Sequence, residues 1–336
     1  MKKNIIDELN NIFHLLVDSC NDISRMSVSL VVDDDVSTLF VADNTTKNPI
    51  IFTKEKLELY HHKNDVIISK SKSVGGRHRS KVRYPIFLGN LILGFVYIHS
   101  TKKNFFENNV SDLTMTINRI STLLNSRTEY YIKFKKEIQP LLEESQSKDV
   151  ETYNHLLRIK NYSYKLSRKL EKTKKEKVTP LLVSEYSIFH DIGKIKIEDE
   201  VLLFTGRYND KQREVMNQHC RFGVELVEQV VEDNNLVNLD LECLKNIILY
   251  HHERWDGKGY PNQLKGKSIP IEARIVSICD VFDALISRRP YKEPWSKNDA
   301  VMFIQEQSGK MFDPFLVRLF LSLQDEMYQM YLDNID

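Results

Sequence analysis

Histidines and carboxylates stand directly after apolar runs in the second half of the chain. His190 and Asp191 follow one such run, and His251 and His252 follow another. An imidazole or a carboxylate at the end of an apolar helix is costly unless it is paired or binds a metal ion. Each pair alone also fits a hydrogen-bonded pair or a solvated helix end, so the case for metal binding depends on further residues.

Three other segments add groups of the same kind. Glu151 and His155 are four residues apart and share one face of a helix, which suits either two metal ligands or a surface pair. His219 lies on the apolar side of a helical stretch, where a hydrogen-bonded core histidine is the plainer interpretation. Asp280 lies in an apolar helical segment with Asp283 on its face, and their repulsion favours a nearby cation.

Together these groups predict a cluster of two or three divalent metal ions, because so many ligands exceed the needs of one ion. The candidate ligands are Glu151, His155, His190, Asp191, His219, His251, His252 and Asp280. Imidazole and carboxylate ligands suit iron, manganese or zinc, and iron or manganese best. The four cysteines form no CxxC pair that would indicate a zinc knuckle. Such clusters polarise phosphoryl oxygens and generate hydroxide from bound water, which predicts phosphoester hydrolysis.

The elements that position these groups are predicted to be helices. After residue 142 strand signals nearly vanish, and periodic apolar residues indicate an all-α bundle. The predicted helices span residues 148–170, 181–192, 210–232, 238–252, 271–287, 297–307 and 314–333. The basic run Arg168–Lys177 fits a solvated helix end and loop better than a phosphate-binding patch.

The first half of the chain has the element order of an α+β domain. A helix is predicted over residues 4–25, short strands over 26–32, 37–42, 50–53 and 65–70, and a loop over 71–81. Two stronger strands, 83–88 and 91–99, flank Gly89 and Asn90, which suit a hairpin turn. A long helix is predicted over 106–142.

Composition limits the class of protein. The chain has 336 residues, of which 41% are hydrophobic and 28% charged, so global disorder is excluded and two domains are expected. A net charge of +1 gives no basic excess for binding along a nucleic-acid polymer. The start lacks the apolar run of a signal peptide, and no apolar stretch reaches the roughly 20 residues of a membrane span. We therefore expect a cytoplasmic protein.

Four ordered motifs resemble the HD-GYP family, a branch of the HD-domain phosphohydrolases. HDIGK stands at His190–Lys194, and HHERWDGKGYP stands at His251–Pro261. DVFDALISRRPYK follows at Asp280–Lys292, and SGKMFDP at Ser308–Pro314 is similar to the C-terminal signature of the family. The resemblance covers residues 148–330. It implies an all-α bundle that hydrolyses cyclic di-GMP at a centre of two or three metals, giving pGpG and then GMP.

The resemblance also implies roles for single residues. The core metal ligands would be His190, Asp191, His219, His251, His252 and Asp280, with Asp191 as the bridging catalytic carboxylate. Glu151 and His155 match the positions that hold a third metal. Lys194 matches a lysine beside the scissile phosphate, and Arg289 and Lys292 match contacts to phosphate or guanine. Asp283 and Tyr260 are weaker candidates, for contacts with the substrate or within the loop.

The N-terminal half resembles a GAF-type sensor, on its element order and the hairpin Pro85–Ile98. The predicted organisation is a GAF-like domain over 1–125, a connecting helix over 126–147 and an HD-GYP domain over 148–336. Related proteins lead us to expect a homodimer formed through the long helix, regulation by the N-terminal domain, and a GGDEF-type partner at the GYP loop. Trp255 and Tyr260 fit equally well as partner contacts or as packing within that loop.

Two other functions stay open at the level of sequence. One is a receptor that binds a cyclic dinucleotide with negligible turnover and signals by protein contact. The other is a phosphodiesterase for a different substrate, such as a mixed guanine–adenine cyclic dinucleotide, because a metal centre does not distinguish bases. The complete set of core ligands favours an enzyme.

Overall fold

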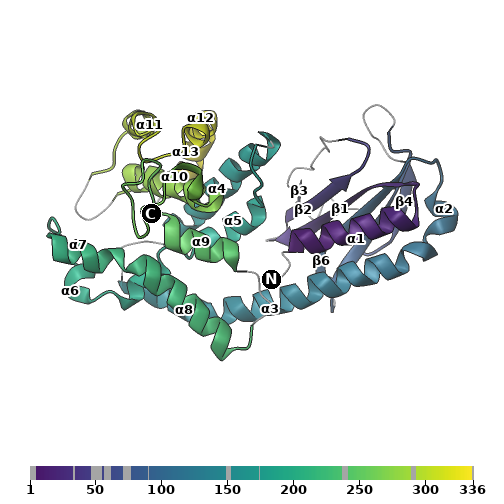
Figure 1. Ribbon diagram of the computed structural model, residues 1–336, viewed down its shortest axis with the longest axis horizontal. Coiled ribbons are helices and arrows are strands. Elements are labelled where there is room, and N and C mark those ends of the chain that lie inside the picture. The colour runs from purple at the N-terminus through teal and green to yellow at the C-terminus, as the bar shows by residue number, and fades with distance from the viewer. Residues whose placement is uncertain are drawn as a thin grey trace. The chain divides into compact units, whose positions relative to one another are not determined.

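The computed structural model describes residues 5–32, 35–46, 55–56, 62–70, 77–89, 91–148, 153–173, 175–236, 241–288 and 293–334 (Figure 1). The chain forms two compact units, and the division falls between Ile132 and Lys133. This point lies inside one long helix, α3 (Thr114–Lys148), so a single element belongs to both units. Each unit is compact by itself.

The N-terminal unit is an antiparallel sheet with strand order β3-β2-β1-β6-β5-β4. The strands are β1 (Ile23–Val32), β2 (Asp35–Asp43), β3 (Glu55–Lys56), β4 (Ile67–Lys70), β5 (Ser80–Leu88) and β6 (Leu91–Ser100). β1 lies at the centre and pairs with β6 in the register Val28↔Val96. The predicted hairpins β1–β2 and β5–β6 are both present.

Helix α1 (Ile5–Ser19) packs its apolar face on one side of this sheet (Figure 1). Leu9, Phe13 and Leu16 join a core that also contains alternate strand residues and the first part of α3. The predicted helix over 4–25 is too long, because the chain turns after Ser19 and Ile23 already begins the central strand. The strand predicted over 50–53 lies outside the described residues.

The long helix begins later than predicted and extends further. A short helix α2 (Phe106–Asn109) and a 3-10 turn η3 (Ser111–Leu113) precede it, and α3 then runs without interruption to Lys148. Its buried residues are Ile117, Ile120 and Leu124 before the division and Phe134, Ile138 and Leu142 after it. The same helix therefore contributes to two separate cores.

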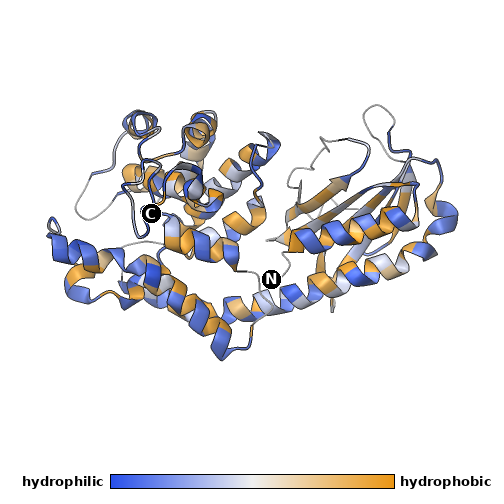
Figure 2. Ribbon diagram, viewed as in Figure 1, coloured by the Kyte–Doolittle hydropathy of each residue, from blue (hydrophilic) through white to orange (hydrophobic). Residues whose placement is uncertain are grey.

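The C-terminal unit is built from helices, as predicted. They are α4 (Tyr153–Thr173), α5 (Pro180–Ser187), η4 (Ile192–Lys196), α6 (Asp199–Leu202), α7 (Asp210–Asn217), α8 (His219–Asp233), α9 (Glu242–Tyr250), η5 (Gly266–Ser268), α10 (Ile271–Ile286), α11 (Lys297–Glu306), α12 (Pro314–Leu321) and α13 (Gln324–Leu332). Polar and apolar residues alternate around them, as expected for helices that bury one face (Figure 2). The predicted fold class, an α+β unit joined by a long helix to an all-α bundle, is confirmed.

Three predicted helices are divided in the structure. The helix predicted over 181–192 ends at Ser187, the one over 210–232 breaks at Gln218, and the one over 314–333 breaks at Leu323. The last break lets Phe320 and Met327, both fully buried, reach the core from two helices. Among the described residues, no helix is both long enough and apolar enough to span a membrane.

Contacts among three aromatic rings hold together the helices that carry His155 and Asp280. The ring of Phe282 on α10 lies 5.8 Å from Tyr162 on α4 and 5.0 Å from Phe320 on α12, measured between centroids. All three side chains are buried. Edge-to-face pairs of this kind add about 0.5–1.5 kcal/mol each to the burial of their area. The packing holds α4 against α10, and these helices carry His155 and Asp280.

Candidate metal centre

The HDIGK motif lies beyond the end of α5, where His190 and Asp191 form a turn and the remaining residues begin η4. The Nδ1 of His190 lies 2.9 Å from the carbonyl oxygen of Ser187, the last residue of α5. A Cβ on Gly193 would lie 1.9 Å from the carbonyl oxygen of His219 and 2.4 Å from the amide nitrogen of Gly223. Only a glycine allows this turn to approach α8 so closely, and the approach brings Asp191 to His219.

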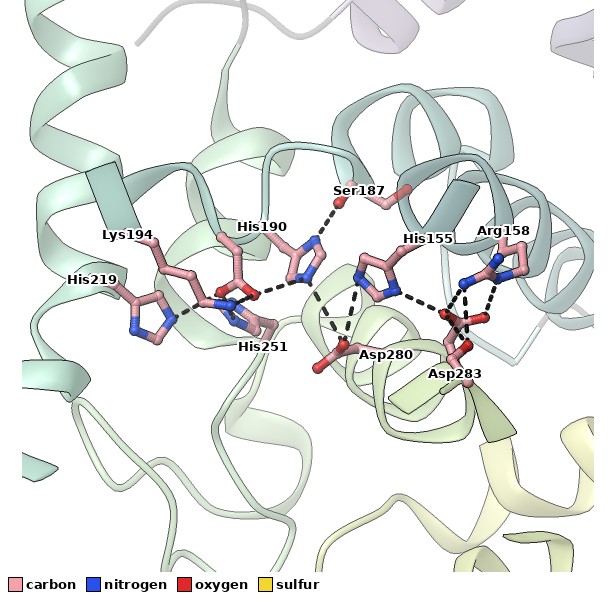
Figure 3. A network of polar contacts seen from close by, with 11 residues as sticks. His155, Arg158, Ser187, His190, Lys194, His219, His251, Asp280 and Asp283 are labelled. Carbon is pink, nitrogen blue, oxygen red and sulfur yellow. Dashed lines mark hydrogen bonds and ion pairs between the residues drawn. The ribbon is translucent and has the colours of Figure 1, made fainter. Parts of the chain in front are cut away.

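One group of ligands lies around the Oδ1 atom of Asp191. Figure 3 labels two of its histidines, His219 and His251. The Nε2 of His219 lies 3.1 Å from this atom, and the Nε2 of His251 lies 3.3 Å from it. His219 begins α8, whereas His251 and His252 follow α9. One nitrogen or oxygen from each of Asp191, His219, His251 and His252 lies within 4.8 Å of the others.

Backbone carbonyls turn these imidazoles toward the carboxylate. The Nδ1 of His219 lies 2.7 Å from the carbonyl oxygen of Met216, and the Nδ1 of His251 lies 3.1 Å from those of Ile247 and Ile248. A carbonyl oxygen accepts a hydrogen bond, so we assign N–H to each Nδ1. With a metal ion bound, the lone pair of each Nε2 would point toward that ion beside Asp191.

A second group of candidate ligands includes His190 itself. His155, His190 and Asp280 each place a ligand atom within 4.8 Å of the other two. The Nε2 atoms of His155 and His190 are each 3.9 Å from the Oδ1 of Asp280. The Nε2 of His190 is also 3.3 Å from the Oδ2 of Asp191. Asp191 therefore presents one oxygen to the first group and the other to the second.

The donor atoms fit divalent cations. Among the described residues, the buried Nε2 of His251 and Oδ1 of Asp191 lack a hydrogen-bond partner, although they lie close together. Burial and the neighbouring histidines hold the pKa of His252 well below its usual value, which keeps that imidazole neutral. Burial would raise the pKa of Asp191, but the charge of Lys194 is the largest opposing effect, and the pKa of the carboxyl lies well below its usual value. Converging lone pairs around a buried carboxylate are what a cation stabilises.

Two polar residues border the ligands. The Nζ of Lys194 lies 2.9 Å from the Oδ2 of Asp191, the oxygen that also faces His190, and the Lys194 side chain is 15% exposed, so its ammonium group stands at the edge of the centre. The ring of Tyr260 lies 4.8 Å from that of His252 and covers it. Both residues were predicted at the site, and the structure places both beside the ligands.

The GYP loop is held by a residue that the sequence analysis did not single out. The carboxylate of Glu253 accepts hydrogen bonds from the amides of Asn262, at 2.7 Å, and Leu264, at 3.0 Å. A Cβ on Gly259 would lie 2.4 Å from the amide nitrogen of Arg254, so the loop also needs this glycine. The acid directly after the paired histidines was the available signal.

Trp255 is part of the packing of the loop. Its amide donates to the carbonyl of Met311 at 3.0 Å, which ties the loop to the SGKMFDP segment. The guanidinium of Arg274 lies 5.8 Å from the Trp255 ring. Of the two interpretations of this tryptophan, packing is the one with contacts in the structure.

One predicted contact is wrong, and three predicted residues lie outside the described residues. Asp283 was expected to touch substrate and to repel Asp280, but it is fully buried and bound to Arg158 and His155. Its two oxygens are occupied by hydrogen bonds from Arg158 and His155, and the guanidinium balances its charge. The residues that the structure does not describe are Glu151, Arg289 and Lys292.

The family of the chain follows from a match over most of this unit. The HD-domain family matches residues 123–316, more than half of the chain. This protein belongs to the HD-domain family. The predicted relationship to the HD-GYP branch is confirmed with it.

Two curated relatives of this HD-domain protein come from Vibrio cholerae. A probable cyclic di-GMP phosphodiesterase is 37% identical over 182 residues, which cover 53% of this chain and 41% of the relative. A 3'3'-cGAMP-specific phosphodiesterase 2 is 34% identical over 192 residues, which cover 57% of this chain and 35% of the relative. This chain therefore spans less than half the length of either relative.

For the N-terminal unit, a solved GAF domain of a two-component sensor histidine kinase from Bacillus halodurans is 13% identical, with a TM-score of 0.30. It covers 36% of this chain and 97% of that domain. A likeness at this level does not decide the fold, so the GAF-like identity of this unit stays a prediction.

Proposed function

We propose that this protein is a metal-dependent phosphodiesterase that hydrolyses cyclic di-GMP to pGpG and GMP. The observation that carries the proposal is the position of Asp191, whose two oxygens face two separate groups of buried ligands at 3.1–3.3 Å. A carboxylate between two such groups is suited to bridge two ions. Two-metal centres are a recurrent solution for the hydrolysis of phosphate esters.

In the proposed reaction, divalent ions bound at this centre would polarise the phosphodiester and lower the pKa of bound water. The protein residues supply position and charge. The first group would hold one ion through Asp191, His219, His251 and His252, and the second would hold another through His155, His190 and Asp280. Lys194, at the exposed edge of the centre, offsets negative charge that develops on the phosphate.

The substrate class rests on names given to relatives and on residues outside the described part of the chain. The two relatives are named for cyclic di-GMP and for 3'3'-cGAMP, and both molecules contain the same kind of phosphodiester. Ions bound at this centre would act on the phosphodiester, which is common to both molecules, so the metal ligands cannot distinguish one base from another. We assign recognition of phosphate or guanine to Arg289 and Lys292, and stacking over the substrate to Tyr260, which already covers His252.

Several wider features belong to the same proposal. We expect iron or manganese as the metal, because the ligands are imidazoles and carboxylates. A third ion would need Glu151 together with His155. The proposed organisation has domains over 1–125 and 148–336 and a connecting helix over 126–147. In this cytoplasmic protein the N-terminal domain regulates the phosphodiesterase domain. A homodimer and a GGDEF-type partner at the GYP loop are further expectations.

A comparison of substrates tests the proposal. Protein prepared without oxygen and loaded with Fe(II) or Mn(II) would be given cyclic di-GMP or 3'3'-cGAMP at matched concentrations, and products would be separated by chromatography. We expect a higher kcat/KM for cyclic di-GMP, with linear pGpG as the first product. A higher value for 3'3'-cGAMP would change the substrate, and tight binding without product would favour a receptor.

A further inference from the structure

A buried polar network lies directly behind His155 and outside the two ligand groups (Figure 3). The Nδ1 of His155 is 2.8 Å from the Oδ2 of Asp283, so the imidazole donates to this carboxylate. Arg158 donates from Nε to Oδ1 at 2.8 Å and from Nη2 to Oδ2 at 3.0 Å. Asp283 is completely buried, and Arg158 is 1% exposed.

His155 is oriented differently from the other imidazoles of the centre. The Nδ1 atoms of His190, His219 and His251 lie against backbone carbonyls. The Nδ1 of His155 lies against a charged carboxylate instead. A carboxylate partner fixes the tautomer and the ring orientation and makes the far nitrogen a stronger metal ligand. For His155 that far nitrogen is Nε2, which faces Asp280.

The arginine explains how the carboxylate can stay ionised in a dry interior. A lone buried carboxylate would be costly, whereas a two-point pair with a guanidinium balances its charge and satisfies its oxygens. The pair thus preserves the acceptor that His155 needs.

The network also reaches the end of the C-terminal helix. The Nη1 of Arg158 donates to the carbonyl of Asn334 at 2.6 Å, and its guanidinium lies 5.4 Å from the ring of Tyr331. The Oγ of Ser287 lies 3.1 Å from Nη2 of Arg158 and 3.2 Å from Oδ2 of Asp283. Segments of α4, α10 and α13 therefore determine together where the His155 ring points.

We propose that Asp283 is a positioning residue for the metal ion held by His155, His190 and Asp280, and that Arg158 keeps Asp283 in place for this role. The inference rests on the proposed metal centre and names the residues that control one of its two ligand groups. It predicts that damage to the network weakens one ion selectively, while a purely structural ion pair would lower stability without changing metal affinity.

Titration with Co(II), followed by its visible absorption and by equilibrium dialysis, tests the proposal without substrate. We expect Asp283→Asn to weaken one equivalent of metal by about 10–100-fold and to leave the other unchanged. In a His219→Ala background, which disables the first group, Asp283→Asn should remove the remaining tight binding. Arg158→Lys keeps the positive charge but loses the two-point contact with Asp283. It should therefore weaken the binding of the same metal equivalent by a smaller factor.

The matched control is Asp313→Asn, which changes an equally buried carboxylate bound to Arg274 at 2.7 Å, away from the ligands. It should lower the melting temperature and leave both metal affinities intact. Unchanged Co(II) binding in Asp283→Asn would overturn the proposal, as would an equal loss of both metals in a folded Arg158→Lys protein. Normal metal binding with no turnover of any cyclic dinucleotide would contradict the proposed function and leave this inference standing.

Discussion

At the scale of single residues, the sequence indicated candidate metal ligands but not the residues that support them. Histidines and acids next to apolar runs drew attention to His190, Asp191 and His251, although each pair alone also fitted a hydrogen-bonded pair or a solvated helix end. Arg158 carries no such signal, because a charged residue on a helix is usually solvated, and Asp283 was noted only as a second carboxylate on the face of Asp280. Only tertiary packing shows that these two meet, so Asp283 was assigned to the substrate when it belongs to His155.

Gly193 gives the first prediction at this scale. In Gly193→Ala, the new Cβ would lie 1.9 Å from the carbonyl oxygen of His219. The turn must then move from α8, which separates Asp191 from His219. We expect a loss of about 1–3 kcal/mol in the free energy of unfolding, the usual range for overpacking, together with weaker metal binding by dialysis.

The control for Gly193→Ala is Gly206→Ala. A Cβ at Gly206 would meet only the ring of Phe204, which is 41% exposed and can rotate away. This change should leave metal binding unaltered. Normal metal affinity in Gly193→Ala would show that the close approach to α8 does not position Asp191.

A buried histidine in the N-terminal unit gives a prediction about pH. Burial, with Arg25, His78 and Lys81 nearby, lowers the pKa of His99 from 6.5 to about 3. Because the folded pKa is depressed, the unfolded chain binds the extra proton between these values. The contribution of His99 to the stability of this unit is therefore fully present above pH 6.5. It falls by about 1.4 kcal/mol per pH unit as the pH decreases toward 3.

Amide exchange in β1 and β6, corrected for the intrinsic effect of pH, measures this dependence between pH 7 and 4.5. His99→Gln cannot titrate, so we expect its slope to be smaller by the share of one proton. Equal slopes in the two proteins would mean that His99 does not contribute. Tryptophan fluorescence would not serve, because Trp255 and Trp295 both lie in the C-terminal unit.

At the scale of elements, apolar periodicity predicted which segments are helical more reliably than where they end. The apolar run before His190 continues past Ser187, so it gave no sign that α5 stops there. The stop is set by contact between Gly193 and α8, which a local pattern does not contain. The first helix was extended too far for a related reason, since Ile23–Arg25 fit either period until the pairing with β6 is known.

The second part of α3 supports the HDIGK turn directly. The ring of Phe134 lies 6.2 Å from that of Phe189, the residue before His190. Lys135 pairs with the buried Glu185 of α5 at 3.1 Å, and Lys148 donates to the carbonyl of Ile195 at 3.3 Å. The second part of α3 therefore packs directly against the segment that carries His190 and Asp191.

Phe134→Ala tests this support. Phe134 is fully buried, so truncation should cost about 3–5 kcal/mol in the free energy of unfolding. It should also lower kcat through a displaced His190. Urea unfolding followed by tryptophan fluorescence gives the first quantity. Ile132→Ala, at a side chain that is 51% exposed on the same helix, should change neither, and a similar loss in both variants would refute a specific role for Phe134.

At the scale of the whole molecule, the centre joins segments that are far apart in sequence. Its ligands come from α4, the HDIGK turn, the start of α8, the turn after α9 and from α10. Binding of metal to the folded form alone should stabilise the C-terminal unit, by about 2.7 kcal/mol when free metal is 100 times Kd. The N-terminal unit holds none of these ligands and should be unaffected.

Chelation tests this difference between the units. Removing metal with EDTA should lower the melting temperature seen by tryptophan fluorescence, which reports on the C-terminal unit. Amide exchange in the sheet of the N-terminal unit should stay constant.

The order of helices and strands predicted two units from the sequence, but the shared helix α3 hides the point of division, since its apolar pattern continues through Ile132 without a break.

The central claim, that Asp191 bridges a metal centre which hydrolyses cyclic di-GMP, is tested most directly by product analysis. Wild-type protein and Asp191→Ala would be purified without oxygen, loaded with Fe(II) or Mn(II), and incubated with cyclic di-GMP. We predict linear pGpG or GMP from the wild type and none above background from Asp191→Ala. Equal product from both proteins, or no product from a wild type with its full complement of metal, would contradict the claim.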